Sequence, residues 1–249
     1  MLTHRAHDYP YLVQRWRALA RASGLRLRAF ANEGEFDLFY LQSPALQATG
    51  GMYLSAGIHG DEAATTEALI EWAEVHAAEL RSLPLIIFPC LNPWGLINNI
   101  RHDRHGYDLN RSFHRDDHTV IGNWKPLVAP FTFAVSLMLH EDYDGQGLYL
   151  YEIKRELPYW GEDLLEAARP VIPIEGRARI DGRKSAAGVV RRRMELKRFT
   201  ELGYPEAIWL HLHGSRRTFT VETPSEFALA QRVAAHKLVI EECMRRLPS

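Results

Sequence analysis

Short apolar runs separated by a segment of helical length are the feature that most constrains the fold of this chain. Residues 51–57 and Leu85–Phe88 are two such runs. The second is apolar throughout, which suits a strand covered on both faces. The segment between them, about 61–80, has Leu69 and Trp72 among its apolar positions and predicts a helix. A strand, a helix and a second strand in succession favour an α/β sheet.

The rest of the chain continues this alternation. No repeat or low-complexity linker interrupts it, so we interpret residues 1–249 as a single domain. The expected fold is α/β, with a mixed, mostly parallel twisted β-sheet and helices on both faces. Sites on such sheets lie beyond the strand ends, where loops converge. The other expected helices are 10–23, 160–169 and 225–246, and the other expected strands are 25–31, 36–42, Phe131–Leu139, Gly147–Ile153, Ile208–His213 and Thr218–Val221.

Composition excludes some classes of partner. The formal net charge is −1, which gives no electrostatic reason to expect binding to nucleic acid or another polyanion. The basic stretch Arg183–Arg198 is the exception. We interpret it as a solvated strand or loop face, and a basic rim that attracts acidic peptide substrates is the alternative.

Cysteine usage and apolar runs bear on the compartment. Cys90 and Cys243 are the only cysteines and lie far apart in the sequence, so no disulfide framework is expected. The first residues contain no apolar stretch typical of a signal peptide. No apolar run is long enough to cross a membrane. We therefore expect a cytoplasmic protein without a membrane partner, and the oligomeric state is left open.

A possible pair of metal ligands follows the first apolar run. Residues 57–62 read Gly-Ile-His-Gly-Asp-Glu, directly after Met52–Ala56. His59 and Glu62 are three positions apart, and such residues share one face of a helical turn. A catalytic zinc takes three protein ligands and leaves a fourth position to water. The alternative is a surface turn, because His-x-x-Glu also occurs by chance.

Three further motifs follow in order along the chain. Residues 92–113 contain Asn-Pro-Trp-Gly and, later, Asp-Leu-Asn-Arg-Ser-Phe. His140 stands in Leu-His-Glu-Asp, and Glu222 stands in Phe-Thr-Val-Glu-Thr-Pro. In this order the motifs resemble the zinc carboxypeptidase family, which includes carboxypeptidase A, bacterial murein peptide amidases and, as a side branch, succinylglutamate desuccinylases and aspartoacylases. The resemblance covers roughly residues 50–225 and specifies the superfamily but not the substrate.

The resemblance implies a role for each matching residue at the metal. His59, Glu62 and His140 would bind one Zn²⁺ per chain. Asp108 would orient a metal-binding histidine by accepting the N–H of its far ring nitrogen, which fixes the tautomer. Glu222 would be the general base that activates the zinc-bound water and then the acid that protonates the leaving amine. An edge-strand glutamate facing water is the alternative for Glu222.

The resemblance also implies a substrate clamp. Asn110 and Arg111 match the residues that hold the substrate carboxylate, for which a guanidinium offers a two-pronged grip. Arg101 matches the arginine that stabilises the oxyanion, and Arg104 is a competitor nearby. The substrate-side tyrosine of the family would fall at Thr200, and Tyr204 is the candidate to replace it.

The loop after the first motifs is rich in histidine. His102, His105, His114 and His118 lie within it. We interpret them as solvated loop residues, and a second metal site is the alternative.

The combined prediction is a zinc metallohydrolase that cleaves an amide bond next to a free carboxylate. A metallocarboxypeptidase acting on small peptides is the first hypothesis. An N-acyl amino acid deacylase of the succinylglutamate desuccinylase/aspartoacylase type is the alternative, because both reactions use the same parts. A binding module that keeps the fold would require loss of Glu222 or of a metal ligand, and none is lost.

Overall fold

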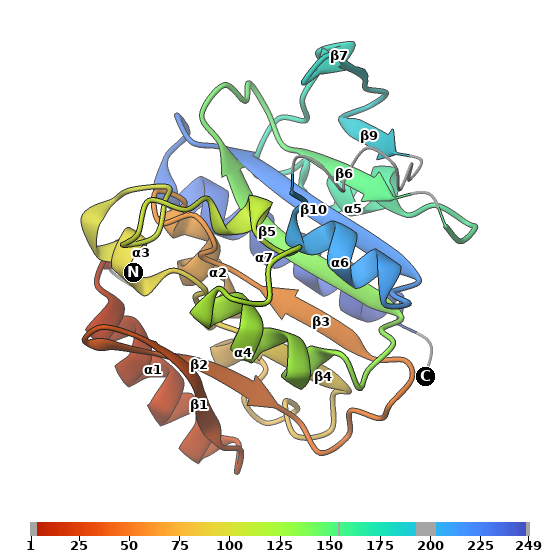
Figure 1. The fold of residues 1–249 in the computed structure, drawn as a ribbon. Helices are drawn as coiled ribbons and strands as arrows, with labels where there is room; N and C mark the ends of the chain where they lie inside the picture. The colour runs from red at the N-terminus through yellow and green to blue at the C-terminus, as the bar shows by residue number, and fades with distance from the viewer. Residues whose placement is uncertain (1–3, 154, 193–202, 248–249) are drawn as a thin grey trace.

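The computed structural model describes residues 4–153, 155–192 and 203–247. Its helices and strands are distributed along the whole chain, with strand–helix–strand units at β3-α2-β4 and β9-α6-β10 (Figure 1). The helices are α1 Tyr9–Ala22, α2 Ala63–Val75, α3 Pro93–Asn98, the 3₁₀-helix η1 Leu109–Arg111, α4 Thr119–Val128, α5 Gly161–Ala168, α6 Glu206–Leu212 and α7 Leu229–Arg245. The strands are β1 Leu27–Glu33, β2 Phe36–Gln42, β3 Met52–Ser55, β4 Leu85–Phe88, β5 Val135–Asp142, β6 Tyr149–Ile153, β7 Arg179–Ile180, β8 Arg183–Lys184, β9 Val189–Arg192 and β10 Arg217–Pro224.

Eight of these strands form one mixed sheet in the order β1-β2-β4-β3-β5-β10-β6-β9. The pairs β4–β3, β3–β5, β5–β10 and β6–β9 are parallel. The pairs β1–β2, β2–β4 and β10–β6 are antiparallel. The predicted α/β class and the mostly parallel sheet are therefore confirmed.

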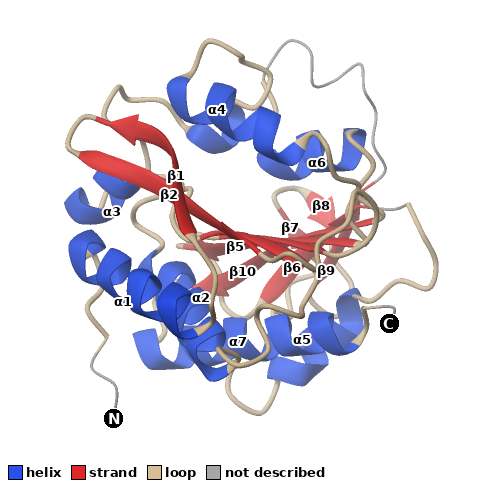
Figure 2. Ribbon diagram, turned by 90° about the horizontal axis from the view of Figure 1, so that it is seen from below, coloured by secondary structure: helices blue, strands red, loops and turns tan. Residues whose placement is uncertain are grey.

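Helices cover both faces of the sheet (Figure 2). On one side α1, α2, α5 and α7 pack over the sheet, and on the other side lie α4 and α6. Residues Ala63–Ala73 of α2 are all buried, because this helix lies between the sheet and its helical neighbours. The central strands β3 and β4 are buried along their whole length, as a strand with helices on both faces requires.

The sheet brings the predicted site residues to one edge. Strands β3, β5 and β10 are adjacent and parallel, so their carboxyl ends meet at the same edge. His59 follows β3, His140 lies near the end of β5 and Glu222 near the end of β10. Glu222 pairs in register with His140. Parallel pairing of strands far apart in sequence thus brings these side chains together.

One predicted element is wrong. Ile208–His213, expected as a strand, lies in the helix α6, which begins at Glu206 after Pro205. Its consecutive apolar residues Ile208, Trp209 and Leu210 are all buried. Such a short apolar run fits a buried helix as well as a strand, so the pattern alone did not decide. The short elements α3, α4, β7, β8 and β9 were not expected.

Both cysteines are free and buried, in agreement with the prediction that they form no disulfide. None of the helices within the described ranges combines the length and the apolar character needed to cross a membrane.

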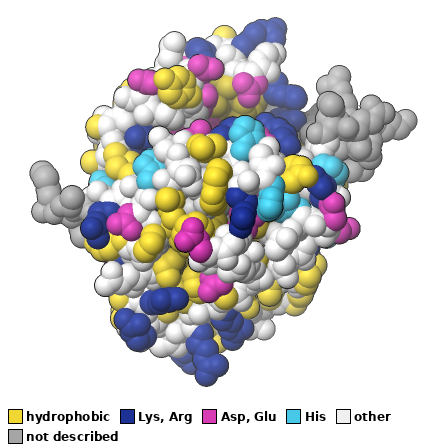
Figure 3. Space-filling model, turned by 60° about the vertical axis from the view of Figure 1, so that its left-hand side comes forward, with side chains coloured by type: hydrophobic (Ala, Val, Ile, Leu, Met, Phe, Trp, Pro, Cys, Tyr) yellow, Lys and Arg dark blue, Asp and Glu magenta, His cyan; other side chains and the backbone are white. Residues whose placement is uncertain are grey.

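On the face that Figure 3 presents, basic and acidic side chains are interspersed with apolar ones, in keeping with the formal net charge of −1.

Candidate metal centre

The loop between β3 and α2 holds His59 and Glu62 in place because two glycines let it pass close to other segments. Gly57 has a positive φ of 62°, and a Cβ there would lie 2.7 Å from Thr66 Cγ2. A Cβ on Gly60 would lie 1.9 Å from the carbonyl carbon of Gly95. Only glycine satisfies both demands. The loop then turns so that the Glu62 amide donates to the His59 carbonyl, and both side chains face the strand ends.

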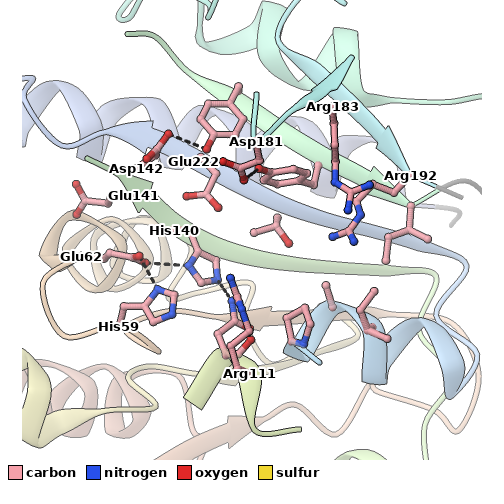
Figure 4. A pocket seen from close by; sticks show the side chains of 18 of the residues that line it. His59, Glu62, Arg111, His140, Glu141, Asp142, Asp181, Arg183, Arg192 and Glu222 are labelled. Atoms are coloured by element: carbon pink, nitrogen blue, oxygen red, sulfur yellow. Dashed lines mark hydrogen bonds and ion pairs between the residues drawn. The ribbon is translucent and has the colours of Figure 1, made fainter. Parts of the chain in front are cut away.

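His59, Glu62 and His140 converge in a buried cluster (Figure 4). His59 Nδ1 lies 2.6 Å from Glu62 Oε1, and His140 Nδ1 lies 2.9 Å from Glu62 Oε2. The three side chains offer ligand atoms that all lie within 4.8 Å of one another. The structure therefore brings together the three predicted ligands, from a loop and from a strand that is distant in sequence.

The cluster fits a divalent cation. Glu62 Oε2 is buried and approaches His140 without the geometry of a hydrogen bond, so it has no hydrogen-bond donor within the described residues. An unsatisfied buried carboxylate oxygen is costly unless a ligand completes it. Two imidazole nitrogens and a carboxylate oxygen are the donors that zinc accepts, and three protein ligands leave a position open.

Charges within the cluster balance one another. Burial favours the neutral form of Glu62, but the charges of His59 and His140 hold its pKa at about 2. Burial opposes protonation of His59, yet Glu62 and Asp108 raise its pKa to about 9. In this arrangement the proton on His59 offsets negative charge on the carboxylates of Glu62 and Asp108. A cation that binds His59 must therefore release this proton.

Asp108 contacts the far side of His59, as predicted. Its Oδ1 lies 3.2 Å from His59 Nε2, and its Oδ2 accepts from Nε and Nη2 of Arg101 at 3.1 and 3.0 Å. Burial raises the pKa of Asp108, but His59 and then Arg101 hold it below its usual value. This ionised carboxylate can accept the far ring N–H of His59, which orients Nδ1 toward the metal position.

The two candidate oxyanion arginines lie in different places. Arg101 lines the cleft around the cluster, and its Nη1 lies 3.9 Å from Glu62 Oε1. Arg104 lies against the β1–β2 turn, where a Cβ on Gly34 would be 2.0 Å from its Nη1. Arg101, and not Arg104, therefore lies beside the three predicted metal ligands. The role of Arg101 in the reaction stays a prediction.

Asn110 and Arg111 lie on η1 and line the same cleft. The amide of Glu206 donates to Asn110 Oδ1 at 3.1 Å, which turns Asn110 Nδ2 the other way, to 3.4 Å from His140 Nε2. Arg111 is exposed and donates from Nη1 to the carbonyl of Asn110. Both side chains thus present N–H groups to the cleft, as a carboxylate clamp requires.

Glu222 projects from β10 toward the cluster (Figure 4). Burial and then the negative charges of Glu62 and Asp142 raise its pKa to about 8, while His140 and Arg101 lower it. A divalent cation at the neighbouring cluster would stabilise the carboxylate and lower this pKa. The alternative of an edge strand facing water does not apply, because β10 lies between β5 and β6.

The cleft that contains these groups has a volume of about 490 Å³. Tyr204, the candidate substrate-side tyrosine, does not line it and instead packs against the apolar cluster under α4 and α6. Thr200 lies outside the described residues. Five further residues line the cleft. Three of them, Tyr149, Tyr151 and Asp181, were not predicted from the sequence, and Arg183 and Arg192 were predicted only as part of the basic stretch. Register on β6 is the signal that indicates the two tyrosines, because β6 pairs with β10 beside Glu222.

The histidine-rich loop divides into two kinds of residue. His102, His105 and His114 are exposed, as the interpretation of solvated residues predicts. His118 is buried: its Nε2 lies 2.8 Å from Asp103 Oδ2, and its Nδ1 accepts from the amide of Val120 at the start of α4. Because Nδ1 is an acceptor, the proton is on Nε2. His118 therefore caps α4 and is hydrogen-bonded to Asp103 rather than solvated. Together with Glu33 and Asp103 it forms a second buried group of possible metal ligands, so the alternative of a second metal site stays open.

A pH-dependent stability is expected from Glu206, which is fully buried beneath Asn110. Burial raises its pKa to about 7, against hydrogen bonds from Tyr53 and Ser55. Because the folded state holds this proton more tightly than the unfolded chain, Glu206 lowers the stability as pH rises from about 4.5 to about 7. The glutamine in Glu206→Gln cannot ionise, so that variant does not lose stability in this way as the pH rises.

The free energy of unfolding of Glu206→Gln, relative to the unaltered protein, should therefore rise across that window by on the order of 3 kcal/mol. Urea denaturation of both metal-free proteins at pH 4.5 and pH 7.5 measures it. An equal difference at both pH values would show that Glu206 is ionised in the folded state.

Known proteins are similar to this chain in two respects: a family model matches part of its sequence, and solved structures match its fold. Residues 48–127 match the model of the succinylglutamate desuccinylase/aspartoacylase catalytic domain. No curated protein matches the chain. A provisionally assigned metallopeptidase from Shewanella amazonensis SB2B superposes with a TM-score of 0.85 at 20% identity, covering 97% of this chain and 94% of that one.

Two further solved structures extend the comparison. A provisionally assigned metallopeptidase from Shewanella baltica OS155 has a TM-score of 0.84 at 20% identity, covering 97% of this chain and 93% of that one. A metallo-carboxypeptidase from Burkholderia cenocepacia has a TM-score of 0.68 at 13% identity, covering 96% and 68%. These comparisons agree with the prediction of a metallohydrolase-type enzyme. They confirm the expected resemblance: the chain has the zinc carboxypeptidase-like fold, and its relatives include the succinylglutamate desuccinylase/aspartoacylase catalytic domain.

Proposed function

We propose that this chain is a zinc-dependent metallocarboxypeptidase that hydrolyses the amide bond next to a free C-terminal carboxylate. The observation that carries the proposal is the position of Glu222 beside the buried ligand set His59, Glu62 and His140, in one cleft with Arg111. A base, a metal position and a carboxylate-binding cation in one cleft are the parts that this reaction needs.

Each residue has a distinct task in the proposed reaction. His59, Glu62 and His140 would hold one zinc, which would supply Lewis acidity that lowers the pKa of a water molecule and polarises the scissile carbonyl. Glu222 would take a proton from the attacking water and pass it to the leaving amine.

The cationic and amide groups have the other tasks. Arg101, already ordered by Asp108, would stabilise negative charge on the carbonyl oxygen, an effect worth about 3–4 kcal/mol of the barrier. Arg111 and Asn110 would bind the terminal carboxylate by their N–H groups.

A deacylase that removes a small acyl group from an amino acid is the second candidate, and the match of residues 48–127 to the desuccinylase/aspartoacylase domain favours it. The two reactions differ on the acyl side of the cleaved bond. A peptidase must accommodate a long acyl chain, whereas a deacylase closes that side. A cleft of about 490 Å³ leaves room beyond one amino acid, which supports the peptidase.

A substrate panel tests this choice. We expect the zinc-loaded protein to cleave peptides with free C-termini faster than N-succinyl or N-acetyl amino acids, and not to cleave the same peptides when their C-termini are amidated. Release of the amino acid is measured at equal substrate concentration. Faster cleavage of the small N-acyl amino acids would assign the chain to the deacylases, and equal cleavage of amidated peptides would exclude the carboxylate clamp.

A further inference from the structure

The helix α2 begins directly after Glu62, which stands at its N-cap. An N-cap side chain normally accepts a hydrogen bond from the amide of the second or third helical residue. Glu62 makes no such bond, because its carboxylate faces His59 and His140 instead. The first amides of α2 therefore need an acceptor from another part of the chain.

Glu141 on β5 is that acceptor (Figure 4). The amide of Ala64, the second residue of α2, donates to Glu141 Oε1 at 2.6 Å. A carboxylate at the N-terminus of a helix also interacts favourably with the helix dipole. Glu141 directly follows His140 on its strand. One side chain therefore connects the helix that begins after Glu62 with the strand that carries His140.

Arg232 on α7 holds the other oxygen of Glu141. Its Nη1 donates to Glu141 Oε2, and its Nε donates to the carbonyl of Phe227 at 2.8 Å, which fixes the guanidinium group. The side chain of Glu141 is buried, and both of its oxygens are engaged. We therefore assign Glu141 no direct contact with the substrate, although it borders the cleft.

We propose that Glu141 is a positioning residue of the metal centre: by capping α2 it keeps the carboxylate of Glu62 available to the metal, and Arg232 keeps Glu141 in place. This inference rests on the proposed function, because it takes Glu62 as a metal ligand. Without the cap, the amide of Ala64 is a buried donor that a side chain at the N-cap can reach. A hydrogen bond from Ala64 would turn Glu62 away from the histidines, and the metal would bind more weakly.

Two double variants test the inference, because they differ only in whether residue 141 offers an acceptor to Ala64. Glu141→Gln with Arg232→Leu and Glu141→Leu with Arg232→Leu both remove the buried ion pair, and replacement of a whole buried pair is often tolerated. The glutamine side chain can still accept from the amide of Ala64, whereas the leucine side chain cannot. We expect the leucine variant to bind zinc about 10- to 100-fold more weakly than the unaltered protein, the range for contacts that orient a metal ligand. The glutamine variant should keep most of the affinity.

Lys237→Leu is the matched control. Lys237 on α7 pairs with Glu71 of α2, so this change removes an ion pair between the same two helices and leaves the N-terminus of α2 as it is. Its zinc affinity should equal that of the unaltered protein.

Competition with a chelator for Zn²⁺ measures the affinities, and thermal unfolding verifies that each variant is folded. Glu141→Met with Arg232→Leu is a second apolar variant, because methionine adapts to irregular spaces. Equal zinc affinity in the glutamine variant and in a folded apolar variant would overturn the inference, whether or not peptides are cleaved. Affinities in the expected order without peptide cleavage by the unaltered protein would overturn the proposed reaction and keep the inference.

Discussion

Glu222→Gln is expected to retain its zinc and to lose about 10²- to 10⁴-fold in kcat, the contribution typical of a general base. Glutamine keeps the shape of the side chain but cannot accept a proton. Glu222 is not one of the converging ligands His59, Glu62 and His140, so metal binding should survive the change. Zinc content by elemental analysis and turnover of a peptide with a free C-terminus measure the two effects on the same sample.

Arg111→Ala provides the contrast. The clamp acts in the ground state and in the transition state alike, so its loss should raise KM and affect kcat less. Turnover of Glu222→Gln near that of the unaltered protein would rule out Glu222 as the base. A loss of zinc in the same variant would instead make Glu222 a metal ligand.

The sequence places His59 and His140 after or near the ends of strongly apolar strands, and the structure brings both together with Glu62. Met52–Ser55 and Val135–Asp142 are buried strands in the middle of the sheet, and parallel neighbours deliver their ends to one edge. Residues that follow β3 and end β5, although far apart in the sequence, therefore lie close together in space. The contact between Asp108 and His59 was expected only from the family resemblance, because Asp108 lies in a loop whose path the sequence does not specify.

The parts that the sequence did not predict depend on register and on short elements. The pattern predicts a strand where the structure has the helix α6, because Ile208, Trp209 and Leu210 form a short apolar run that fits both. Arg191 and Arg192 look alike in a basic stretch, and only the strand β9 assigns them to opposite faces. Choosing Arg101 over Arg104 required the path of a loop, because both lie near the motif in sequence.

His140→Ala should lose most of its bound zinc while the fold survives. The imidazole supplies one of three ligands, and a zinc site with two protein ligands binds far more weakly. The sheet does not depend on His140, because the buried residues Leu137 and Leu139 of the same strand pack in the apolar core. Equilibrium dialysis against a zinc buffer measures the affinity, and circular dichroism verifies the fold.

Asp108→Asn is the graded control for the same measurement. It leaves every ligand in place and removes only the carboxylate at 3.2 Å from His59 Nε2, so we expect a smaller loss of affinity, about 10- to 100-fold. We expect the zinc affinity to be highest in the unaltered protein, lower in Asp108→Asn and lowest in His140→Ala. Full zinc occupancy in folded His140→Ala would show that the metal is held elsewhere, and it would remove the basis for a reaction in this cleft.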